Sequence, residues 1–359
     1  MAYTTIDDPS EYFHTKLYSG TGSELSVTND ANAGDFKPDW IWIKQRNAGS
    51  TDHGVFDSSR GVTKNLKANT SDAESTEAQS VKTFNTDGFT LGTSGDYNGS
   101  SDTHVAWQWK CNGGTTSATV AEDEYAQYGP GNVRQTNTDA GFSIIKYTGT
   151  GQAGQIQHGL GAIPHWVVIK QRTSVGGVAE WVMFHKSLGP THYVKMSTTA
   201  AKIDSSGLWN DEAPTSNVFT VNSSHQANAD SGTFIGYFFT EKQGYSKFGS
   251  YTGNGDEGGP FVHTGFKPQW IMFKNTGAAE EWVLQDTTRN PNNPVTKNIR
   301  VDSSIAEANA TNIDFDFLSN GFKNRSDQAQ LNSSGVSYIY MAFAEHPFVS
   351  SKGVPTTAR

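Results

Sequence analysis

The chain contains a Trp-centred phrase, Phe36-Lys37-Pro38-Asp39-Trp40-Ile41-Trp42-Ile43-Lys44, that returns twice in related form. The later copies read Ile163-Pro164-His165-Trp166-Val167-Val168-Ile169-Lys170 and Phe266-Lys267-Pro268-Gln269-Trp270-Ile271-Met272-Phe273-Lys274. In each copy a Pro stands two residues before a Trp, and an apolar run typical of a strand ends in Lys. The chain therefore contains three versions of one module, and a repeated module favours a structural or binding role over a single catalytic centre.

Further landmarks accompany each Trp phrase in the same order. Before it lies a Gly-rich turn, where Gly supplies the positive φ angles that turns need: Tyr18-Ser19-Gly20-Thr21-Gly22, Tyr147-Thr148-Gly149-Thr150-Gly151 and Tyr251-Thr252-Gly253-Asn254-Gly255. After it come strands that contain Phe56, Phe184 and Leu284, then Phe89, Phe219 and Phe322, and finally Val105–Lys110, Phe234–Phe239 and Tyr338–Phe343. This shared order makes chance repetition an inadequate explanation.

Composition indicates an all-β protein. The chain has 359 residues, enough for three modules that are each the size of a small domain. Charged residues make up 18%, below the roughly 25% of average domains, and Gly, Ser, Thr and Asn fill the gaps between aromatic strands. The formal net charge of −9 argues against nucleic acid as a partner, since phosphate binding needs clustered Lys and Arg.

Short strands bounded by turn residues dominate every module. Such strands predict a β-sandwich in each module, of jelly-roll or lectin-like type, with a barrel as the alternative. Two segments, 72–82 and 303–309, follow Ser or Asp and carry Ala and Glu in an order that suits a turn or two of helix. We therefore expect an all-β chain of three tandem β-sandwich modules with short helical insertions.

The repeat also predicts the domain limits. The modules cover residues 17–111, 141–243 and 244–349, with a linker at 112–140 that contains Gly129-Pro130-Gly131, an N-terminal segment at 1–16 and a polar tail at 350–359. The first 16 residues suit an arm that docks on a neighbour, or else a frayed terminus. The second and third modules have almost no spacer between them, so we expect them to pack rigidly.

The termini and the single cysteine restrict the setting. Cys111 stands alone, so an intramolecular disulfide is impossible, and we interpret it as a structural residue that follows a strand. The start Met1-Ala2-Tyr3-Thr4 has no signal-peptide pattern, and no window approaches the roughly 20 apolar residues of a membrane span. We expect synthesis in a host cytoplasm, no membrane insertion, and export only as part of an assembly.

Motifs for chemistry are absent from the sequence, and we expect no catalytic residue and no cofactor. Asp314 and Asp316 alternate with Phe in a probable strand, so they share a face that is either a weak Ca²⁺ site or simply solvated. Four histidines of the second module lack ligand spacing and are interpreted as structural or surface residues: His158, His165, His185 and His192. Paired carboxylates for glycoside hydrolysis could be sought at Glu122-Asp123-Glu124, Glu180, Asp256-Glu257 and Glu280-Glu281, most of which fall in turns.

Tryptophan could supply platforms for sugar stacking, and the chain has nine. Trp40, Trp166 and Trp270 recur at equivalent strand positions, so we interpret them as core residues. Trp209 lies outside the repeated phrases, in Gly207-Leu208-Trp209-Asn210, and is the weak candidate for an exposed ligand contact. Any recognition surface should lie in the loops where the three copies differ.

Several longer stretches carry a family resemblance. They are Asp57-Ser58-Ser59-Arg60-Gly61-Val62, Asp87-Gly88-Phe89, His104–Lys110, Gly244–Gly255 and Tyr340-Met341-Ala342-Phe343-Ala344-Glu345-His346-Pro347-Phe348-Val349. They resemble an uncharacterised repeat family of virion proteins in marine tailed phages, particularly cyanophages. The resemblance covers nearly the whole chain and implies a component of the virion surface, with other virion proteins as partners and a symmetric homo-oligomer as the assembly. It transfers no catalytic or binding residue.

Together these features predict a non-enzymatic virion structural protein, a tail fibre or fibre-associated component that contributes to host attachment through a surface glycan or receptor. A capsid decoration or head-fibre protein is the alternative. A glycan-degrading tail enzyme is the second alternative.

Overall fold

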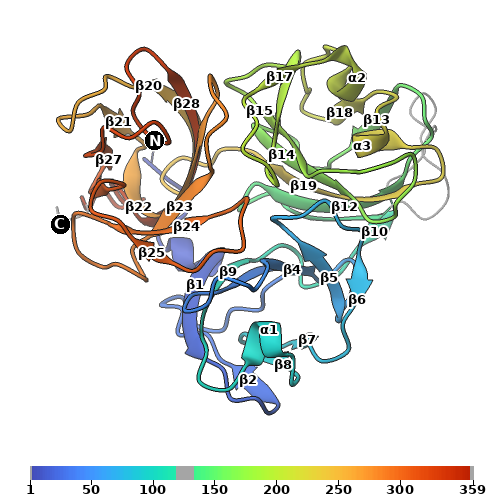
Figure 1. Ribbon diagram of the computed structural model, residues 1–359, viewed down its shortest axis with the longest axis horizontal. Coiled ribbons are helices and arrows are strands. Elements are labelled where there is room, and N and C mark those ends of the chain that lie inside the picture. The colour runs from blue at the N-terminus through green and yellow to red at the C-terminus, as the bar shows by residue number, and fades with distance from the viewer. Residues whose placement is uncertain (1, 119–132, 356–359) are drawn as a thin grey trace.

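The computed structural model, which describes residues 2–118 and 133–355, is nearly all β. Three large antiparallel sheets stand around one central axis, and each forms one lobe of the molecule in Figure 1. A smaller sheet covers the outer side of each large sheet. The all-β, layered fold class expected from the sequence is confirmed.

The strands of the first module form a large and a small sheet. The large sheet has the order β1 (Phe13–Ser19), β9 (Thr103–Trp109), β3 (Trp40–Gln45), β4 (Gly54–Asp57), β5 (Lys64–Lys67) and β6 (Ser75–Thr76). The small sheet consists of β2 (Leu25–Val27), β8 (Phe89–Leu91) and β7 (Val81–Phe84), and the short helix α1 (Gly95–Asn98) precedes β9.

The third module repeats this plan strand for strand. Its large sheet runs β20 (Ser246–Thr252), β28 (Ser337–Pro347), β22 (Phe266–Asn275), β23 (Val283–Asp286), β24 (Lys297–Arg300) and β25 (Ala308–Asn309). Its small sheet is β21 (Phe261–His263), β27 (Gly321–Asn324) and β26 (Phe315–Leu318).

The second module departs from the plan at both sheets. Its large sheet begins with two extra strands, β10 (Ser117–Ala118) and β11 (Val133–Asn137), and continues with β12 (Phe142–Thr148), β19 (Thr233–Phe239), β14 (Trp166–Gln171), β15 (Val182–His185), β16 (His192–Lys195) and β17 (Ile203–Asp204). Its small sheet has only β13 (Gly154–Gln157) and β18 (Val218–Val221), accompanied by the helices α2 (Ser206–Trp209) and α3 (His225–Asn228).

Each Trp phrase forms a strand at the middle of its large sheet, β3, β14 or β22. Successive side chains of a strand point to opposite faces, so Trp40 and Trp42 enter a central core while Ile41 and Ile43 face the small sheet. In β14 and β22 the side chains likewise alternate between the central core and the layer beneath the small sheet of their own module. Because both faces are covered, the phrase is a continuous apolar run.

The inner faces of all three large sheets share one aromatic core. The ring of Trp40 stacks on Trp109 at 4.3 Å between centroids and on Tyr237 of the second module at 4.5 Å. Trp109 meets Trp270 of the third module edge to face at 5.7 Å. Trp166 is buried in the same cluster, so the interpretation of the three repeated tryptophans as core residues is confirmed.

A buried Asn holds the Gly-rich turn of each module. The side-chain oxygen of Asn98 accepts a hydrogen bond from the backbone N–H of Thr21 at 2.8 Å. Asn228 and Asn332 make the same contact with their own turns, at 2.9 Å each. A Cβ at Gly20 would lie 2.1 Å from the carbonyl oxygen of Gly99, so this turn position requires Gly.

Both segments predicted as helices are wrong. Residues 72–82 hold β6 and the start of β7, and residues 303–309 form an irregular segment that ends in β25. Each crosses to a neighbouring module, where Glu74 and Glu307 bind arginines, and these tertiary contacts outweigh the local helix preference. The short helices stand elsewhere, and no helix of the described residues is long and apolar enough to cross a membrane.

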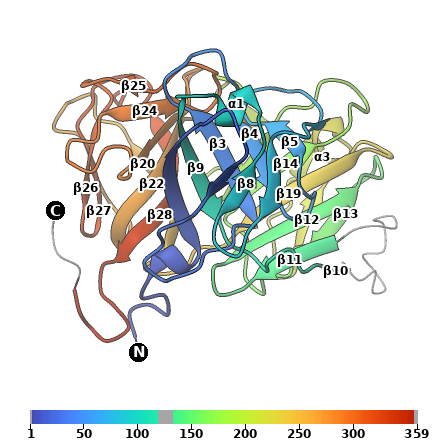
Figure 2. The same cartoon turned by 90° about the horizontal axis from the view of Figure 1, so that it is seen from below.

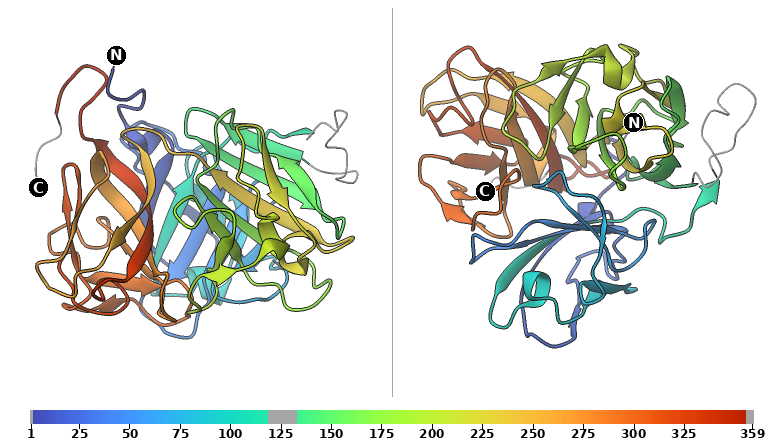
Figure 3. Two further views of the ribbon diagram at one scale, coloured as in Figure 1. Left: turned by 90° about the horizontal axis from the view of Figure 1, so that it is seen from above. Right: turned by 45° about the vertical axis from the view of Figure 1, so that its right-hand side comes forward.

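The segments outside the modules also differ from the predicted limits. The N-terminal segment runs beside the third module of its own chain (Figure 3), where the Tyr3 hydroxyl donates to the carbonyl of Gly265 and Tyr12 packs on Tyr245. Strand β1 already begins at Phe13, inside the segment assigned as residues 1–16. Within the interval 112–140, β10 and β11 belong to the second module, while Gly129-Pro130-Gly131 lies outside the described residues.

The shared core predicts that truncating any of the three repeated tryptophans is costly. Trp40→Ala, Trp166→Ala and Trp270→Ala should each lower the free energy of unfolding by about 3–5 kcal/mol, because each leaves a cavity in a closely packed interior. Urea titrations measure this change. Val178→Ala, at a side chain that is 67% exposed, is the control and should change stability by less than about 0.5 kcal/mol. Unchanged stability of the Trp variants would contradict the core assignment.

Candidate functional site

Three equivalent lysines join the modules in a ring. Lys44, Lys170 and Lys274 end the three Trp phrases, and all three are buried. Each ammonium donates to a carbonyl oxygen of its own module and to one of a neighbouring module. The contacts across the junctions are Lys44 to Ser304 at 3.0 Å, Lys170 to Ser71 at 2.9 Å and Lys274 to Thr199 at 3.0 Å. Burial lowers the pKa of each lysine to about 8.

A second ring of contacts starts where β4, β15 and β23 begin. The indole N–H of Trp181 donates to the carbonyl of Lys67 at 2.8 Å, and that of Trp282 donates to Lys195 at 2.9 Å. In the first module His53 replaces the Trp. Its Nδ1 accepts from the Trp42 indole at 2.9 Å, so Nε2 carries the proton and donates to the carbonyl of Arg300 at 3.0 Å. The molecule thus has approximate threefold symmetry within one chain.

Two of the junctions also carry buried ion networks. Between the first and second modules, Glu74 accepts from Arg172 at 2.8 and 2.9 Å and from Arg60 at 3.1 Å. Arg60 in turn pairs with Asp57, which accepts from the Tyr237 hydroxyl at 2.7 Å. The arginines lower the pKa of Glu74, although its burial acts in the opposite direction.

The junction of the first and third modules repeats this network. Glu307 accepts from Arg46 at 2.9 and 3.0 Å and from Arg289 at 3.1 Å. Arg289 pairs with Asp286, and Asp286 accepts from the Trp107 indole at 3.0 Å. Equivalent acids and arginines therefore bind each other across two of the junctions.

The junction of the second and third modules lacks the network. His185, Lys202 and Thr276 stand where the other junctions have Asp, Glu and Arg. Lys202 keeps only the backbone contact, donating to the carbonyl of Thr276 at 3.2 Å. His185 Nε2 lies 3.2 Å from the carbonyl oxygen of Tyr340, and burial lowers the pKa of His185 to about 3. A neutral histidine thus replaces the carboxylate at this junction.

The exposure expected for Trp209 is wrong. Helix α2 turns the indole inward, where it is fully buried and meets Phe219 edge to face at 5.1 Å. The sequence around Trp209 forms one turn of helix. Its apolar side, Leu208 and Trp209, packs into the hydrophobic cluster of the second module that also contains Phe219. A buried ring offers no face to a sugar, so Trp209 is no exposed platform.

Asp314 and Asp316 flank Phe315 at the start of β26. Asp316 lies 3.5 Å from Arg325, and burial raises the pKa of Asp314. A guanidinium therefore faces this pair of acids. Among residues 2–118 and 133–355, no three His, Cys, Asp or Glu side chains gather in a way that could hold a metal ion.

The other sequence candidates have structural contacts. Glu180 accepts from the Ser197 hydroxyl at 2.6 Å, Glu281 pairs with Arg300 at 2.9 Å, and Asp256 caps the backbone N–H of Gly258 at 2.6 Å. Glu122-Asp123-Glu124 lies outside the described residues. Three of the four histidines accept a backbone N–H at Nδ1: His158, His165 and His185. The ring of His192 contacts the hydroxyl of Thr191. Burial raises the pKa of the Cys111 thiol.

Sequence reasoning missed one acid with an unusual protonation state. Burial raises the pKa of Asp302 to about 6, with a smaller contribution from the charge of nearby Glu281. A carboxyl pKa raised towards neutral pH is what a general acid requires. However, Asp302 accepts from the backbone N–H of Trp282 at 3.0 Å, and Arg300 holds Glu281. No sequence motif marks this acid, because its pKa depends on burial.

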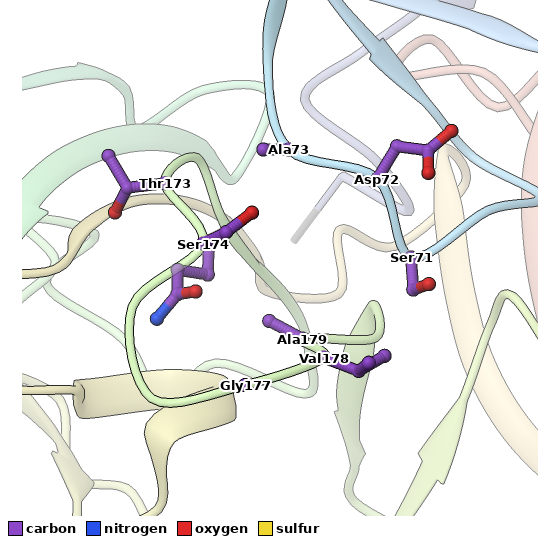
Figure 4. A pocket seen from close by; sticks show the side chains of 9 residues that line it. Ser71, Asp72, Ala73, Thr173, Ser174, Gly177, Val178 and Ala179 are labelled. Carbon is purple, nitrogen blue, oxygen red and sulfur yellow. The ribbon is translucent and has the colours of Figure 1, made fainter.

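Three clefts among the described residues lie where the modules meet or differ. A cleft of about 400 Å³ separates Ser71 and Asp72 of the first module from Thr173, Ser174 and Val178 of the second, as Figure 4 shows. A cleft of about 280 Å³ between the first and third modules includes His14 and His346. The largest, of about 630 Å³, lies on the second module between Arg134 and the turn at Thr215–Asn217.

The ion networks predict that substitutions at equivalent positions of the three junctions differ in their cost to stability. Glu74→Gln should lower the free energy of unfolding by about 2–4 kcal/mol, because it leaves Arg60 and Arg172 without their shared carboxylate. Lys202→Ala changes the equivalent position of the third junction and should cost less than about 1 kcal/mol. Urea unfolding measures both, and equal effects would contradict the assigned networks.

Buried histidines predict acid sensitivity. Burial lowers the pKa of His53 and His185 to about 3, whereas both titrate near 6.5 when unfolded. Below pH 6.5 the unfolded chain binds more protons, so stability falls as the pH drops from about 6.5 towards 3. Each histidine should account for about 2 kcal/mol between pH 8 and pH 5. His185→Gln should remove its share of that loss. An unchanged pH dependence would show that the pKa of His185 is the same in the folded and unfolded states, and would contradict its burial as a neutral group.

Comparison with protein families gives a match over nearly the whole chain. No curated protein matches the chain. The model of a family described as a domain of unknown function, DUF7483, matches residues 8–347, which span all three modules. The family assignment therefore covers the threefold body as one unit and brings no chemistry with it. The chain belongs to the DUF7483 family.

Proposed function

We propose that the chain is a non-enzymatic structural component of a phage virion, a tail fibre or fibre-associated protein that contributes to host attachment. The observation that carries the proposal is the ring of three modules around a shared core. Such a body presents three similar lobes around an axis. Fibres and their adaptors occupy symmetry axes, where a partner of related symmetry can contact each lobe in a similar way.

The polar groups of the modules favour a structural role. The lysines, arginines and acids that recur between modules are used to hold one module against the next. Recurrence of a residue in this chain therefore reflects assembly of the body. A protein without disulfides that must persist outside a cell benefits from such internal junctions.

Two alternatives have specific support. The approximate threefold symmetry also suits a decoration protein at a threefold position of a capsid. The raised pKa of Asp302, beside Glu281, is the feature that favours a glycan-degrading tail enzyme, since glycosidases pair a protonated acid with a second carboxylate. The hydrogen bond from Trp282 to Asp302 and the ion pair of Glu281 with Arg300 favour a structural role for both acids instead.

Particle labelling tests the location. Gold-labelled antibodies against the purified chain should mark the tail of intact virions, and a particle reconstruction should place the three-lobed body there. Density on the capsid shell would support the decoration alternative and contradict the tail assignment. Absence from purified virions would overturn the proposal.

An activity assay tests the non-enzymatic assignment. The purified chain should release no reducing sugar from host surface polysaccharide, and Asp302→Asn should behave like the wild type. Release by the wild type and its loss in Asp302→Asn would establish the enzyme alternative.

A further inference from the structure

The cleft of about 630 Å³ lies where the second module departs from the threefold plan. The added strand β11 extends the large sheet beside β13, as Figure 2 shows. The small sheet here lacks the third strand present in the other two modules, and the turn at residues 210–217 takes the space beside β18. The groove of about 630 Å³ therefore lies between β11, which has no counterpart in the first and third modules, and the reduced small sheet of β13 and β18.

Among the described residues, the lining of this groove is mainly polar and carries no carboxylate. It combines the guanidinium of Arg134, the amides of Gln155, Gln157 and Asn217, and the hydroxyls of Thr215 and Ser216. The whole chain has a formal net charge of −9, so a groove with a cation and no acid is unlike the surface average. Glu212, near this side of the module, accepts from Thr220 and Asn210 and does not line the groove.

The groove has a fixed floor. Ile156 and Phe219 point into the core of the module, so Gln155 and Gln157, one residue away on β13, face outward together. The backbone N–H of His158 donates to the carbonyl of Asn217 at 3.3 Å, and the His158 ring lies 3.1 Å from the carbonyl of Thr215. The turn at Thr215–Asn217 is thereby tied to the end of β13.

Arg134 closes one side of the groove. Its side chain lies against Gly159, where an added Cβ would come within 2.9 Å of Arg134 Nε. Gly159 has a φ of +74°, which suits Gly and lets the chain turn beneath the guanidinium. Within the described part of the chain, the guanidinium of Arg134 and the side-chain amide of Gln157 have no hydrogen-bond or ion-pair partner. These groups can therefore serve a ligand.

We propose that this groove binds a uronic acid residue of a surface glycan. The guanidinium of Arg134 presents paired donors that match the two oxygens of a planar carboxylate. The amides and hydroxyls around it both donate and accept, as sugar hydroxyls require. None of the described residues that line the groove is aromatic, so recognition is by hydrogen bonds and charge. The inference rests on the proposed attachment role and specifies the chemistry of its ligand.

A single cation distinguishes this ligand from other anions. Binding of a nucleic acid strand needs several phosphate contacts from clustered Lys and Arg, which the groove lacks. A sulfated glycan would also be attracted to Arg134, but a tetrahedral sulfate matches the planar guanidinium fork less well than a carboxylate does. Sulfated sugars are therefore the informative competitors.

Calorimetric titration of the purified full chain tests the site. The probes are trimers of galacturonate, glucuronate and mannuronate, with a neutral galactose trimer and a sulfated galactan oligosaccharide for comparison. At least one uronate trimer should bind at least about tenfold more tightly than the neutral and sulfated sugars, and its affinity should fall as salt rises. Failure of all three uronates, or a preference for the sulfated sugar, would overturn the proposal.

Variants locate the binding. Arg134→Gln should weaken uronate binding about tenfold or more, and Asn217→Ala, in an exposed turn, should weaken it severalfold. Arg325→Gln removes a half-exposed arginine of the third module and is the matched control, with unchanged affinity expected. Melting temperatures establish that each variant is folded. Binding that survives both groove substitutions would refute the site, and Asn217→Ala tests it even if Arg134→Gln does not fold.

The titration and the particle experiments test the groove and the virion role independently of each other. A chain found on virions without uronate binding would refute the groove and leave the structural role intact. A chain that binds uronate through Arg134 but is absent from virions would keep the site and refute the attachment role.

Discussion

Burial of each large sheet on both faces is the constraint on which the rest of the structure depends. A small sheet covers the outer face, and the inner face must be covered by the other two modules because no other layer is present in the described residues. Trp40, Trp109 and Trp270 meet across this interior. The modules are consequently parts of one body. Each Trp phrase is a continuous apolar run because both faces of its strand are buried.

The same arrangement explains the polar residues at the ends of the strands. A ring of three modules creates three junctions, and each junction leaves carbonyl groups that need donors in a dry environment. Lys44, Lys170 and Lys274 meet this need in the same way at every junction. Among the described residues, the networks of arginine with buried carboxylates occupy two of the three junctions, so the packing of the modules recurs while their charges differ. The groove beside Arg134 lies where the second module departs from the other two by its extra strand β11.

The sequence predicted the fold class and the buried role of the repeated tryptophans, because strand periodicity and repetition are local signals. It did not predict that the modules share a core, since the partner of an apolar face cannot be read from the face itself. The two predicted helices failed because Glu74 and Glu307 serve arginines of neighbouring modules. The predicted exposure of Trp209 was wrong because the sequence Gly-Leu-Trp-Asn is typical of an exposed turn, whereas the chain forms a helical turn there that buries the indole.

The residues of the groove carry no motif, and Gln155, Arg134 and Asn217 come from separate parts of the chain. Only the expectation that recognition lies where the copies differ pointed toward them. The buried Asn98, Asn228 and Asn332 could have been found, because each precedes the last strand of its module at a similar distance.

Differential scanning calorimetry tests the shared core most directly. If the three modules form one body, the intact chain unfolds in a single transition whose calorimetric and van't Hoff enthalpies agree. Two or three separate transitions, each with the enthalpy of one module, would show that the modules are independent domains and would contradict the account.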